Sequence, residues 1–446
     1  MSVFHAYDIR GIYGKNLLPD MVYKMGFFLP SVLETNQIAV GRDCRESSPA
    51  MYKALVRGIC DAGAHVVDLG LTTTPMVYYT TARHQFDGSV QITASHNDAE
   101  YNGLKVSRSG AMPVGYANGL NRLEELVMHH TPVPVQKRGA VTSLDLKKEY
   151  FSFLSKWVPQ SMHLKAGVDC SNGMAGMFIK KLLGTRQVVY INEKPDGRFP
   201  NHPPNPLVPE NIRQLQDLVK ERKCDVGIIF DGDADRVMFT DENGTFVSPD
   251  LIIALLGHHF LDGNPARVLQ DIRSSKAVGE YLSPMGAEMH TWRVGRAFAT
   301  PKLKEIDGLY GGELAGHYYF KDFFYSDSGL LAALLVLHVL TLLNKPFSEI
   351  VRNIKKYEGS GEINFRIERK QEAMDALKKH FTTQETPTAF YDFDGYRVEF
   401  PQWWFNVRPS NTEPYLRFIA EAREAELLQE KLKEMHAVLN SFIQSP

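Results

Sequence analysis

The sequence predicts an α/β protein with three related α/β domains, whose sheets are mixed and mostly parallel, followed by a C-terminal α+β domain. Its length of 446 residues corresponds to roughly three domains at about 150 residues each. One pattern recurs three times: a β run, a polar or glycine-rich turn, a helical stretch and another β run. Such alternation is typical of βαβ units. Because the end of the chain breaks this pattern, we expect four domains rather than three.

The three copies of the pattern are only weakly similar in sequence and occupy separate parts of the chain. The first copy has β runs at 37–43 and 65–70, with a helical stretch to Ala62 between them. The second has β runs within 164–173 and at 188–192, with a helical stretch to Leu183. The third has β runs within 266–275 and 288–295, with a helix over Lys276–Leu282. Each copy is expected to form one parallel or mostly parallel sheet.

The last part of the chain has a different pattern. Residues 362–368 are predicted to form a strand and 369–381 an amphipathic helix. Residues 391–400 carry an Asp-Gly pair between β-prone residues, which is typical of a hairpin. Apolar residues recur at helical spacing over 421–443. These elements together predict an α+β domain.

Stretches that suit linkers lie near 131–140, 247–251 and 355–362. They predict domains at 1–135, 136–247, 248–358 and 359–446. In open α/β sheets, ligands bind beyond the carboxyl ends of the strands. Since the polar clusters of this chain lie at such ends or in loops, we expect them to converge in a cleft between domains.

The composition excludes several classes of protein. Hydrophobic residues make up 43 % and charged residues 23 %, which is typical of globular proteins and not of disordered, collagen-like or disulfide-built ones. The net charge of −2, without a basic tract, gives no reason to expect a nucleic-acid or membrane partner. The most apolar stretch, 329–343, is shorter than the ~18–20 residues of a membrane span, so we interpret it as a buried helix. The four cysteines lie far apart, and the first residues do not resemble a secretory signal, so a cytoplasmic protein is expected.

Three carboxylates, Asp231, Asp233 and Asp235, follow the apolar run 226–230. Three like charges in five residues repel one another, and they therefore favour a bound cation. Alternate residues of a flat strand are roughly 6.6 Å apart, too far to share an ion at ~2.1 Å, so the chain must curl here. Oxygen ligands favour Mg²⁺, Mn²⁺ or Ca²⁺ over zinc. An EF-hand is excluded because Arg236 stands where that loop requires glycine. A solvated acidic turn remains the alternative interpretation.

Four further motifs have the composition of functional loops. Ser95 follows a β run, with His96 and Asn97 beside it, but a serine is a weak nucleophile unless a base or metal activates it, and an ordinary turn is the alternative. Residues 408–414 combine Arg, Ser, Asn and Thr, which suits a phosphate dianion or a capped turn. In residues 310–317, glycines flank a carboxylate and an imidazole. These groups could bind sugar hydroxyls, and a plain glycine turn is the alternative. Residues 7–11 place an arginine before a glycine.

Together these motifs resemble those of the α-D-phosphohexomutase family, particularly its bacterial and archaeal phosphomannomutase/phosphoglucomutase branch. The resemblance spans the whole chain in the family's order, through Tyr7 to Gly11, Thr93 to Asn97 with Lys105, Asp231 to Arg236, Gly312 to His317, and Arg408 to Pro414. It implies four domains around a central cleft.

The resemblance also implies roles for individual residues. Ser95 is implied as the phosphorylated serine, and the catalytic group comprises Ser95, His96, Lys105, Arg10, Arg236 and His317. The implied metal ligands are Ser95, Asp231, Asp233 and Asp235. The implied substrate-binding residues are Glu313, His317, Arg293, Arg408, Ser410, Asn411, Thr412 and Arg417.

The activity implied is that of an isomerase, a phosphohexomutase that interconverts hexose 1-phosphate and hexose 6-phosphate, with mannose and/or glucose as the hexose. Mg²⁺ is the implied cofactor, and a hexose 1,6-bisphosphate is both the intermediate and the activator or primer. The expected partners are small sugar phosphates, and a monomer or weak homodimer is expected.

Three alternatives stay open: a phosphoglucosamine mutase, a metal-dependent sugar phosphatase and a non-catalytic sugar-phosphate sensor. Against the first, Leu314 stands where the glucosamine branch typically has Gln. Against the second, the 408–412 loop would have no evident purpose in a phosphatase. Against the third, a sensor would not need to keep Ser95. Asp98, Ala315 and Arg296 depart from the family pattern. Because the last two lie in loops expected to read the sugar, the preferred hexose stays open.

Overall fold

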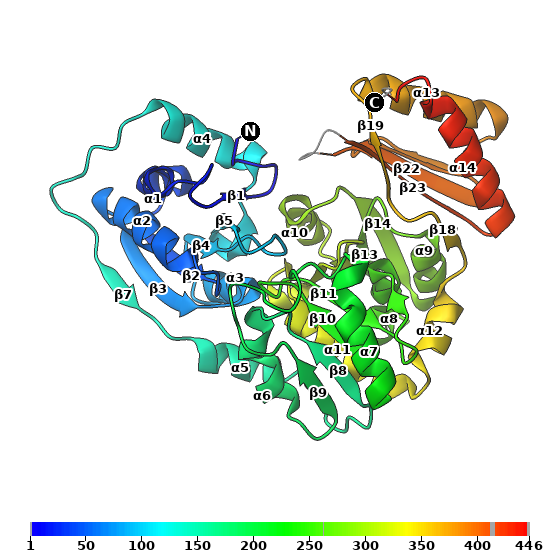
Figure 1. Ribbon diagram of the computed structural model, residues 1–446, viewed down its shortest axis with the longest axis horizontal. Helices are drawn as coiled ribbons and strands as arrows, with labels where there is room; N and C mark the ends of the chain where they lie inside the picture. Colours follow the sequence, from blue (N-terminus) through cyan, green and yellow to red (C-terminus); the bar gives the residue numbers. More distant parts are fainter. Residues whose placement is uncertain (1, 262, 411–414, 444–446) are drawn as a thin grey trace.

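The computed structural model describes residues 2–261, 263–410 and 415–443, which form four domains arranged in an arc (Figure 1). The first domain has a mixed sheet in the order β1-β5-β4-β2-β3-β7, with β6 beside β5. Its strands β2, β3, β4 and β7 pair in parallel, whereas β1, β5 and β6 pair antiparallel. The elements are β1 (Ile9–Ile12), α1 (Pro19–Leu33), β2 (Gln37–Arg42), α2 (Ser48–Asp61), β3 (His65–Leu71), α3 (Thr74–Arg83), β4 (Gly88–Ile92), β5 (Tyr101–Arg108), β6 (Met112–Pro113), α4 (Leu120–His129) and β7 (Val141–Ser143).

The second domain repeats the mixed arrangement, with the order β12-β11-β10-β8-β9. Strand β10 is buried along its whole length, since β8 and β11 pair with its two edges and its alternate side chains enter two different hydrophobic cores. The elements are α5 (Lys147–Ser155), β8 (Ala166–Asp169), α6 (Ile179–Leu183), β9 (Val188–Ile191), α7 (Arg213–Arg222), β10 (Val226–Phe230), β11 (Val237–Thr240) and β12 (Phe246–Val247).

The third domain has the order β14-β13-β15-β16-β17, again with parallel pairs on one side and antiparallel pairs on the other. Its elements are α8 (Pro249–Phe260), β13 (Ala266–Asp271), α9 (Lys276–Leu282), β14 (Ala287–Trp292), α10 (Arg296–Glu305), β15 (Tyr310–Gly312), β16 (Tyr318–Phe320), β17 (Ser326–Asp327), α11 (Gly329–Leu343) and α12 (Phe347–Ile354).

The fourth domain is an antiparallel sheet, in the order β18-β23-β22-β21-β20 with β19 beside β23, covered by two helices. Its elements are β18 (Glu358–Gly359), β19 (Ile363–Arg366), α13 (Lys370–Gln384), β20 (Ala389–Tyr391), β21 (Tyr396–Glu399), β22 (Trp403–Pro409), β23 (Tyr415–Ala422) and α14 (Ala425–Leu439). The predicted α+β domain with its hairpin over 391–400 is confirmed.

Helix α11 packs in the largest hydrophobic core, which extends over the second and third domains. The Ser328 side chain caps its start by accepting a hydrogen bond from the Leu331 N–H, and Asn344 ends it in the left-handed conformation. Among the described residues no single helix has the length and apolarity of a membrane span, and α11 and α12 reach them only jointly, across a bend of 96°. The prediction of a buried helix at 329–343 is confirmed.

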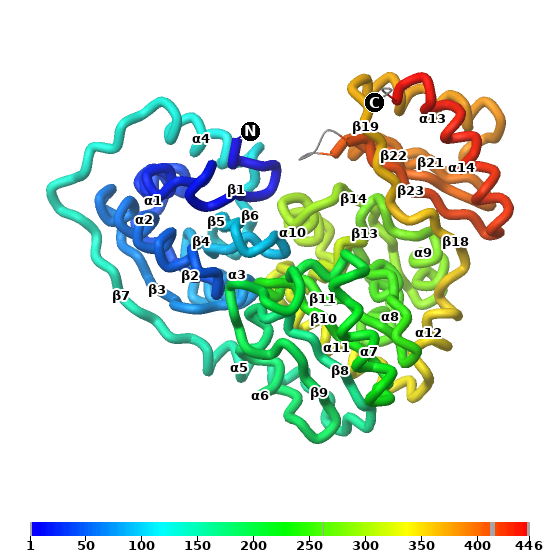
Figure 2. Tube along the Cα trace, viewed as in Figure 1, coloured from blue at the N-terminus to red at the C-terminus, as the bar shows by residue number. Residues whose placement is uncertain are grey.

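Several boundaries differ from the sequence prediction. The helical spacing noted from residue 421 begins a helix only at Ala425, because Glu421 and Ala422 pair with β22 as the end of β23. Strand β7 extends the first sheet to Ser143, and the chain around it runs along the outside of the first domain (Figure 2). Residues 247–251 pass from β12 directly into α8 rather than forming an extended linker.

Candidate active site

The chain curls after β10, as the three carboxylates require. Ala234 has a φ of +63°, and the side chains of Asp231, Asp233 and Asp235 are all buried. One oxygen from each carboxylate lies within 4.8 Å of the others. Oxygen atoms at this spacing can approach a common cation, so the curled loop converts the alternating sequence into one cluster.

The charges of this cluster are only partly balanced. Burial, and after it the charges of Asp233 and Asp235, raises the pKa of Asp231 well above its usual value. The Oδ1 atoms of Asp233 and Asp235 are buried and accept no hydrogen bond from any residue that the structure describes. Buried carboxylate oxygens without partners are costly, and a divalent cation would satisfy them. The cluster therefore fits a hard cation bound through oxygen.

Ser95 lies beside this cluster although it belongs to the first domain. It follows β4, is fully buried and has a φ of +52°. Its Oγ donates a hydrogen bond to Asp231 Oδ2 at 2.7 Å, and its N–H donates to Thr93 Oγ1 at 3.0 Å. A non-glycine residue in this conformation is strained and is retained only where the surroundings fix it. The strained turn points the hydroxyl at the carboxylate cluster.

Two features hold the serine loop against the aspartate loop. A Cβ at Gly232 would stand 2.5 Å from the Ser95 carbonyl oxygen, so only glycine allows this approach. Behind the loop, the buried Arg45 guanidinium donates to the carbonyls of Ser95, Asn97, Asp98 and Tyr101. Arg45 was not among the residues that the sequence singled out, and its carbonyl partners lie 50 to 56 positions away.

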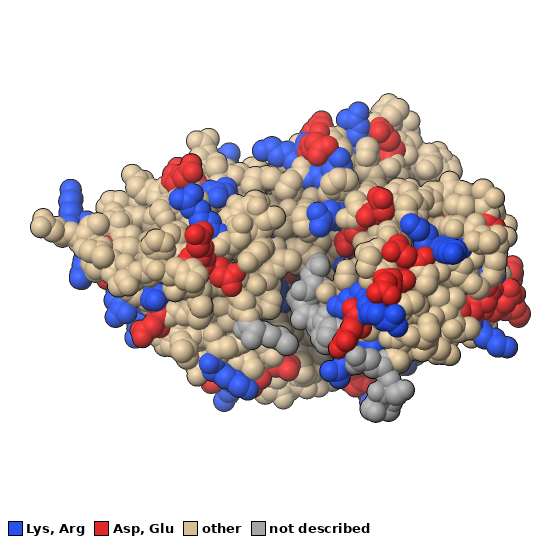
Figure 3. Space-filling view, turned by 90° about the horizontal axis from the view of Figure 1, so that it is seen from above, with Lys and Arg blue, Asp and Glu red and all other residues tan. Residues whose placement is uncertain are grey.

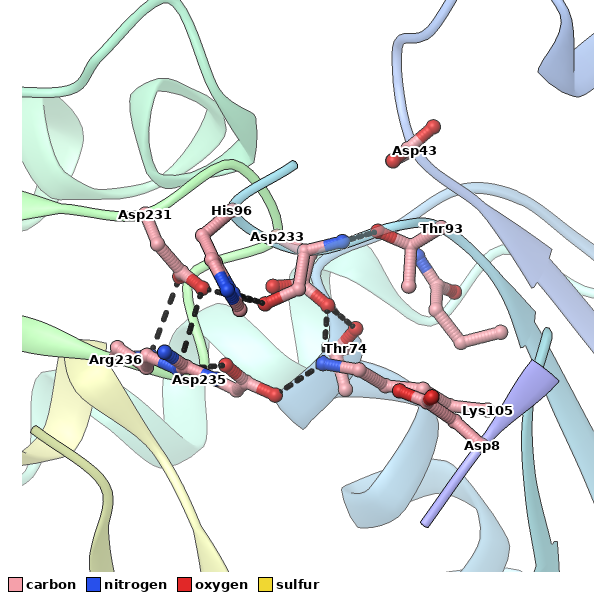
Figure 4. Close-up of polar contacts among 12 residues, drawn as sticks. Asp8, Asp43, Thr74, Thr93, His96, Lys105, Asp231, Asp233, Asp235 and Arg236 are labelled. Carbon is pink, nitrogen blue, oxygen red and sulfur yellow. Dashed lines mark hydrogen bonds and ion pairs between the residues drawn. The ribbon is translucent and has the colours of Figure 1, made fainter. Parts of the chain in front are cut away.

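Three basic side chains named in the sequence analysis contact the serine loop or the aspartate loop. Lys105 of β5 forms ion pairs with Asp233, at 2.7 Å, and with Asp235, and Figure 4 shows it reaching both carboxylates. Burial alone would lower the pKa of Lys105, but these two carboxylates outweigh it and raise the pKa above its usual range. Arg236 Nε lies 3.9 Å from Asp231 Oδ2. Arg10 donates to Asn97 Oδ1 at 2.7 Å, which links β1 to the serine loop.

The two predicted histidines differ in their surroundings. Burial, and after it the charges of Arg236 and Arg10, holds the pKa of His96 well below its usual value, and its Nδ1 lies 3.5 Å from Ser95 Oγ. His317 Nδ1 donates to Asp327 Oδ2 at 2.6 Å, while its Nε2 accepts from Arg236 Nε at 3.0 Å. His317 thus belongs to the third domain but touches the aspartate loop of the second.

Of the predicted sugar-binding residues, Glu313 lies next to His317. It is buried and accepts hydrogen bonds from the Tyr319 hydroxyl at 2.7 Å and from the Gly295 N–H at 3.2 Å. Burial raises its pKa above the usual value. Arg293 is exposed and packs its guanidinium over the Phe298 ring, 4.0 Å from the ring centroid.

The predicted phosphate loop forms a second group on the fourth domain. Arg408 is buried at the end of β22, 3.7 Å from Asp394 Oδ1, and its Nε has no hydrogen-bond partner in the described parts of the chain. Burial, and after it the charge of Arg273, lowers the pKa of Arg408. The Ser410 N–H donates to the Tyr415 carbonyl, and Arg417 forms an ion pair with Glu362 at 3.0 Å. Asn411 and Thr412 lie outside the described residues.

Besides Arg45, sequence reasoning missed Thr74, Asp327 and Arg273. Thr74 Oγ1 donates to Asp233 Oδ2 at 2.5 Å across the first two domains, and Asp327 holds the imidazole of His317. Arg273 follows β13 in an Asp-Ile-Arg run, and polar residues just beyond the carboxyl end of a strand are typical of a ligand site. Its position after a strand could therefore have identified Arg273 from the sequence, whereas no sequence feature identified Thr74.

Comparisons with known proteins agree with this arrangement. Four family models match in order along the chain: phosphoglucomutase/phosphomannomutase alpha/beta/alpha domains I, II and III at residues 1–131, 148–244 and 248–357, and the C-terminal domain at residues 362–437. A phosphomannomutase of Escherichia coli is 35 % identical, covering 98 % of this chain and 99 % of the relative.

Solved structures give the same result. A phosphoglucomutase/phosphomannomutase family protein from Burkholderia thailandensis has a TM-score of 0.88 at 27 % identity, covering 98 % of this chain and 97 % of the other. An N-acetylphosphoglucosamine mutase of Aspergillus fumigatus, solved with GlcNAc-6P and magnesium, shares the fold at 14 % identity, with a TM-score of 0.61 and coverage of 99 % and 96 %. The match extends over all four domains and in the same order, and the chain belongs to the phosphoglucomutase/phosphomannomutase family.

Proposed function

We propose that this protein is a phosphohexomutase that interconverts hexose 1-phosphate and hexose 6-phosphate, with mannose and/or glucose phosphates as substrates. The observation that carries the proposal is the hydrogen bond from Ser95 Oγ to Asp231 Oδ2 at 2.7 Å, which joins a strained serine of the first domain to a buried carboxylate cluster of the second. Family membership supplies the class of reaction.

Asp231, Asp233 and Asp235, together with the oxygen of Ser95, would hold Mg²⁺. The support is the set of buried carboxylate oxygens that accept no hydrogen bond from the described residues. When bound, a divalent cation neutralises negative charge on a transferring phosphoryl group.

In the proposed reaction, phospho-Ser95 donates its phosphoryl group to a free hydroxyl of the hexose monophosphate. The bond from phosphorus to Ser95 Oγ breaks, and a new bond forms from phosphorus to the sugar oxygen, giving a hexose 1,6-bisphosphate. Because Lys105 is paired with Asp233 and Asp235, we assign the base to His317: the sugar hydroxyl proton passes to its Nε2, in place of the hydrogen bond from Arg236. The opposite phosphate later returns to Ser95, and the same bisphosphate can prime an unphosphorylated enzyme.

The charges of the side chains support this assignment. Three carboxylates and a phosphoserine dianion exceed the charge of one divalent cation by about three. Arg10, Arg236 and Lys105, all in contact with the serine or aspartate loop, supply three positive charges. Phosphoryl transfer depends mainly on positioning and on such electrostatic balance. Arg408, whose buried Nε has no hydrogen-bond partner among the described residues, is the proposed anchor for the other phosphate of the substrate.

A coupled assay with Ser95→Ala tests the proposal. The wild-type protein should convert mannose 1-phosphate or glucose 1-phosphate to the 6-phosphate in the presence of a trace of hexose 1,6-bisphosphate, and the variant should not. Ser107→Ala, at another buried serine of the same sheet, is the matched control and should remain active. Turnover by Ser95→Ala would contradict the proposal.

Further arms of the same assay separate the alternatives. Release of inorganic phosphate from a sugar monophosphate would indicate a phosphatase, and preference for glucosamine 1-phosphate a glucosamine mutase. No turnover, together with no phosphoserine in the intact mass, would indicate a sensor.

A further inference from the structure

We propose that Arg296 is a positioning residue, which fixes the imidazole of His317 relative to the serine loop through Asp327 and through the first domain. The inference rests on the proposed function, because it assigns His317 a part in the mutase reaction. It assigns a role to a residue that departs from the family pattern.

Arg296 opens α10, and its side chain is only 11 % exposed. Its Nε donates to Asp327 Oδ1 at 3.0 Å, and its Nη2 donates to the Ala111 carbonyl oxygen at 2.7 Å. The guanidinium carbon lies 3.6 Å from the centroid of the Tyr78 ring. A single planar side chain thus contacts a carboxylate of its own domain and, in the first domain, both a carbonyl and an aromatic face.

Asp327 divides its two oxygens between Arg296 and His317. Its side chain is fully buried in β17, with Oδ1 on the guanidinium and Oδ2 on His317 Nδ1 at 2.6 Å. A carboxylate accepts hydrogen bonds, so His317 must carry its proton on Nδ1. The lone pair is then on Nε2, which accepts the hydrogen bond from Arg236 Nε beside the aspartate loop. Arg296 acts on this tautomer because its charge keeps the buried Asp327 ionised.

The contacts with the first domain give Arg296 a second effect on the site. Ser95 belongs to the first domain and His317 to the third, so their separation depends on how these two domains meet. Tyr78 lies in α3, whose first residue, Thr74, bonds to Asp233. Arg296 packs on this same helix, so it holds the imidazole loop against the element that also contacts the aspartate loop. A displacement of about 1 Å is enough to slow such a reaction strongly.

Arg296→Gln and Arg296→Lys test the inference. Lysine keeps the charge but has one donor group instead of a fork, and glutamine loses the charge. At saturating bisphosphate we expect kcat to fall about a hundredfold for Arg296→Gln and less for Arg296→Lys, with little change in KM, because the residue positions the imidazole and does not touch the substrate. Arg267→Lys is the matched control, since Arg267 also joins a carboxylate, Glu288, to a backbone carbonyl, that of Ile306, and it should behave as wild type.

A second readout is independent of turnover. In ¹⁵N-histidine-labelled protein, the imidazole of His317 should show the Nδ1–H tautomer, assigned from the signal lost in His317→Asn. Asp327→Asn, which can donate a hydrogen bond where aspartate accepts one, should shift it toward the Nε2–H tautomer, and Arg296→Gln should broaden or shift the same signal. Melting curves establish that each variant is folded. If Arg296→Gln does not fold, the same two measurements are made on Arg296→Lys.

The two readouts separate the failure of this inference from that of the proposed function. A wild-type protein without mutase activity refutes the proposed function, and the inference with it where it concerns catalysis. An active wild-type enzyme with unchanged kcat and an unchanged His317 signal in Arg296→Gln overturns only the inference. A rise in KM at constant kcat also overturns it, because that result would make Arg296 a substrate contact.

Discussion

Glu421→Gln is expected to make the protein more stable than wild type at alkaline pH and similar to it at acidic pH. Glu421 lies in β23, at the junction between the third and fourth domains, where its Oε2 accepts hydrogen bonds from Ser275 Oγ at 2.5 Å and from Trp404 Nε1 at 2.9 Å. The N–H of the same Ser275 donates to Asp250 Oδ2 at 2.8 Å. Two carboxyl groups on opposite sides of the junction thus share one serine.

Burial, and after it the charge of Asp250, raises the pKa of Glu421 from 4.5 to about 7. The folded protein therefore holds a proton that the unfolded chain releases between these two values. The stabilisation is fully present below about pH 4.5 and is lost as the pH rises through 7. A pKa rise of this size corresponds to a change of about 3 kcal/mol in the free energy of unfolding between acidic and alkaline pH. Since the Glu421 side chain keeps some exposure to solvent, we expect a change of about 1–2 kcal/mol.

Urea unfolding of both proteins at pH 5.5 and pH 8.5 measures this effect. Glutamine is neutral at every pH and its oxygen can accept the same two hydrogen bonds, so the variant should lose this part of the pH dependence. Glu358→Gln is the control, because Glu358 lies in the neighbouring strand β18 but is 54 % exposed. The reasoning would be refuted if wild type and Glu421→Gln differed in free energy of unfolding by the same amount at both pH values. It would also be refuted if the wild-type protein were more stable at pH 8.5 than at pH 5.5.

Three further predictions concern the close contact at the site, the core and the metal. Gly232→Ala should lower kcat strongly and destabilise the fold by about 1–3 kcal/mol, because its Cβ would stand 2.5 Å from the Ser95 carbonyl, and a variant with wild-type kcat would argue against that contact. Leu335→Ala, in the buried face of α11, should lower the free energy of unfolding by about 2–5 kcal/mol. The exposed Leu342→Ala in the same helix should change it by less than about 0.5 kcal/mol, and equal effects at both positions would contradict the assigned core. Chelation with EDTA should abolish mutase turnover, and added Mg²⁺ should restore it. Added Mg²⁺ should also raise the melting temperature of the wild-type protein but not that of Asp233→Asn. Full activity in EDTA would count against the metal site.

Local pattern was sufficient for some parts of this molecule and insufficient for others. The strand over 226–230 and the helices over 276–282 and 329–343 have the predicted bounds, because each has apolar residues bounded by polar or capping residues. The curl of the aspartate loop also followed from spacing alone, since three carboxylates cannot share an ion along a flat strand. The resemblance to a family then named the residues that meet this loop.

The missed residues depend on contacts between distant parts of the chain. Thr74 reaches Asp233 over 159 positions, and nothing in the sequence around Thr74 distinguishes it from a helix-capping threonine. Asp327 precedes a serine that caps α11, so its surroundings in sequence also suggest a helix start. Thr74 is recognised only when the first two domains are assembled, whereas Asp327 meets its partner His317 within the third domain, on another loop.

Under the proposed function, the site must keep the phosphoserine in place and yet release one end of a bisphosphate, and the distribution of contacts between domains suits this requirement. The contacts of Ser95, Lys105 and Thr74 with the aspartate loop join the first two domains at the reacting group itself. The fourth domain is joined differently. Arg397 Nη1 donates to the carbonyls of Ile272 and Ser274, Lys276 Nζ donates to the Phe400 carbonyl, and the Val294 N–H donates to Asp394 Oδ2 beside Arg408. These contacts join the fourth domain to the third and do not involve Ser95, so a turn of the fourth domain would leave the contacts of Ser95 in place. Since the proposed bisphosphate must exchange its two ends, the phosphate group that the proposed function assigns to Arg408 would have to be released while the serine and carboxylate loops stay together. We therefore expect the movement that accompanies this exchange to involve the fourth domain, which carries Arg408.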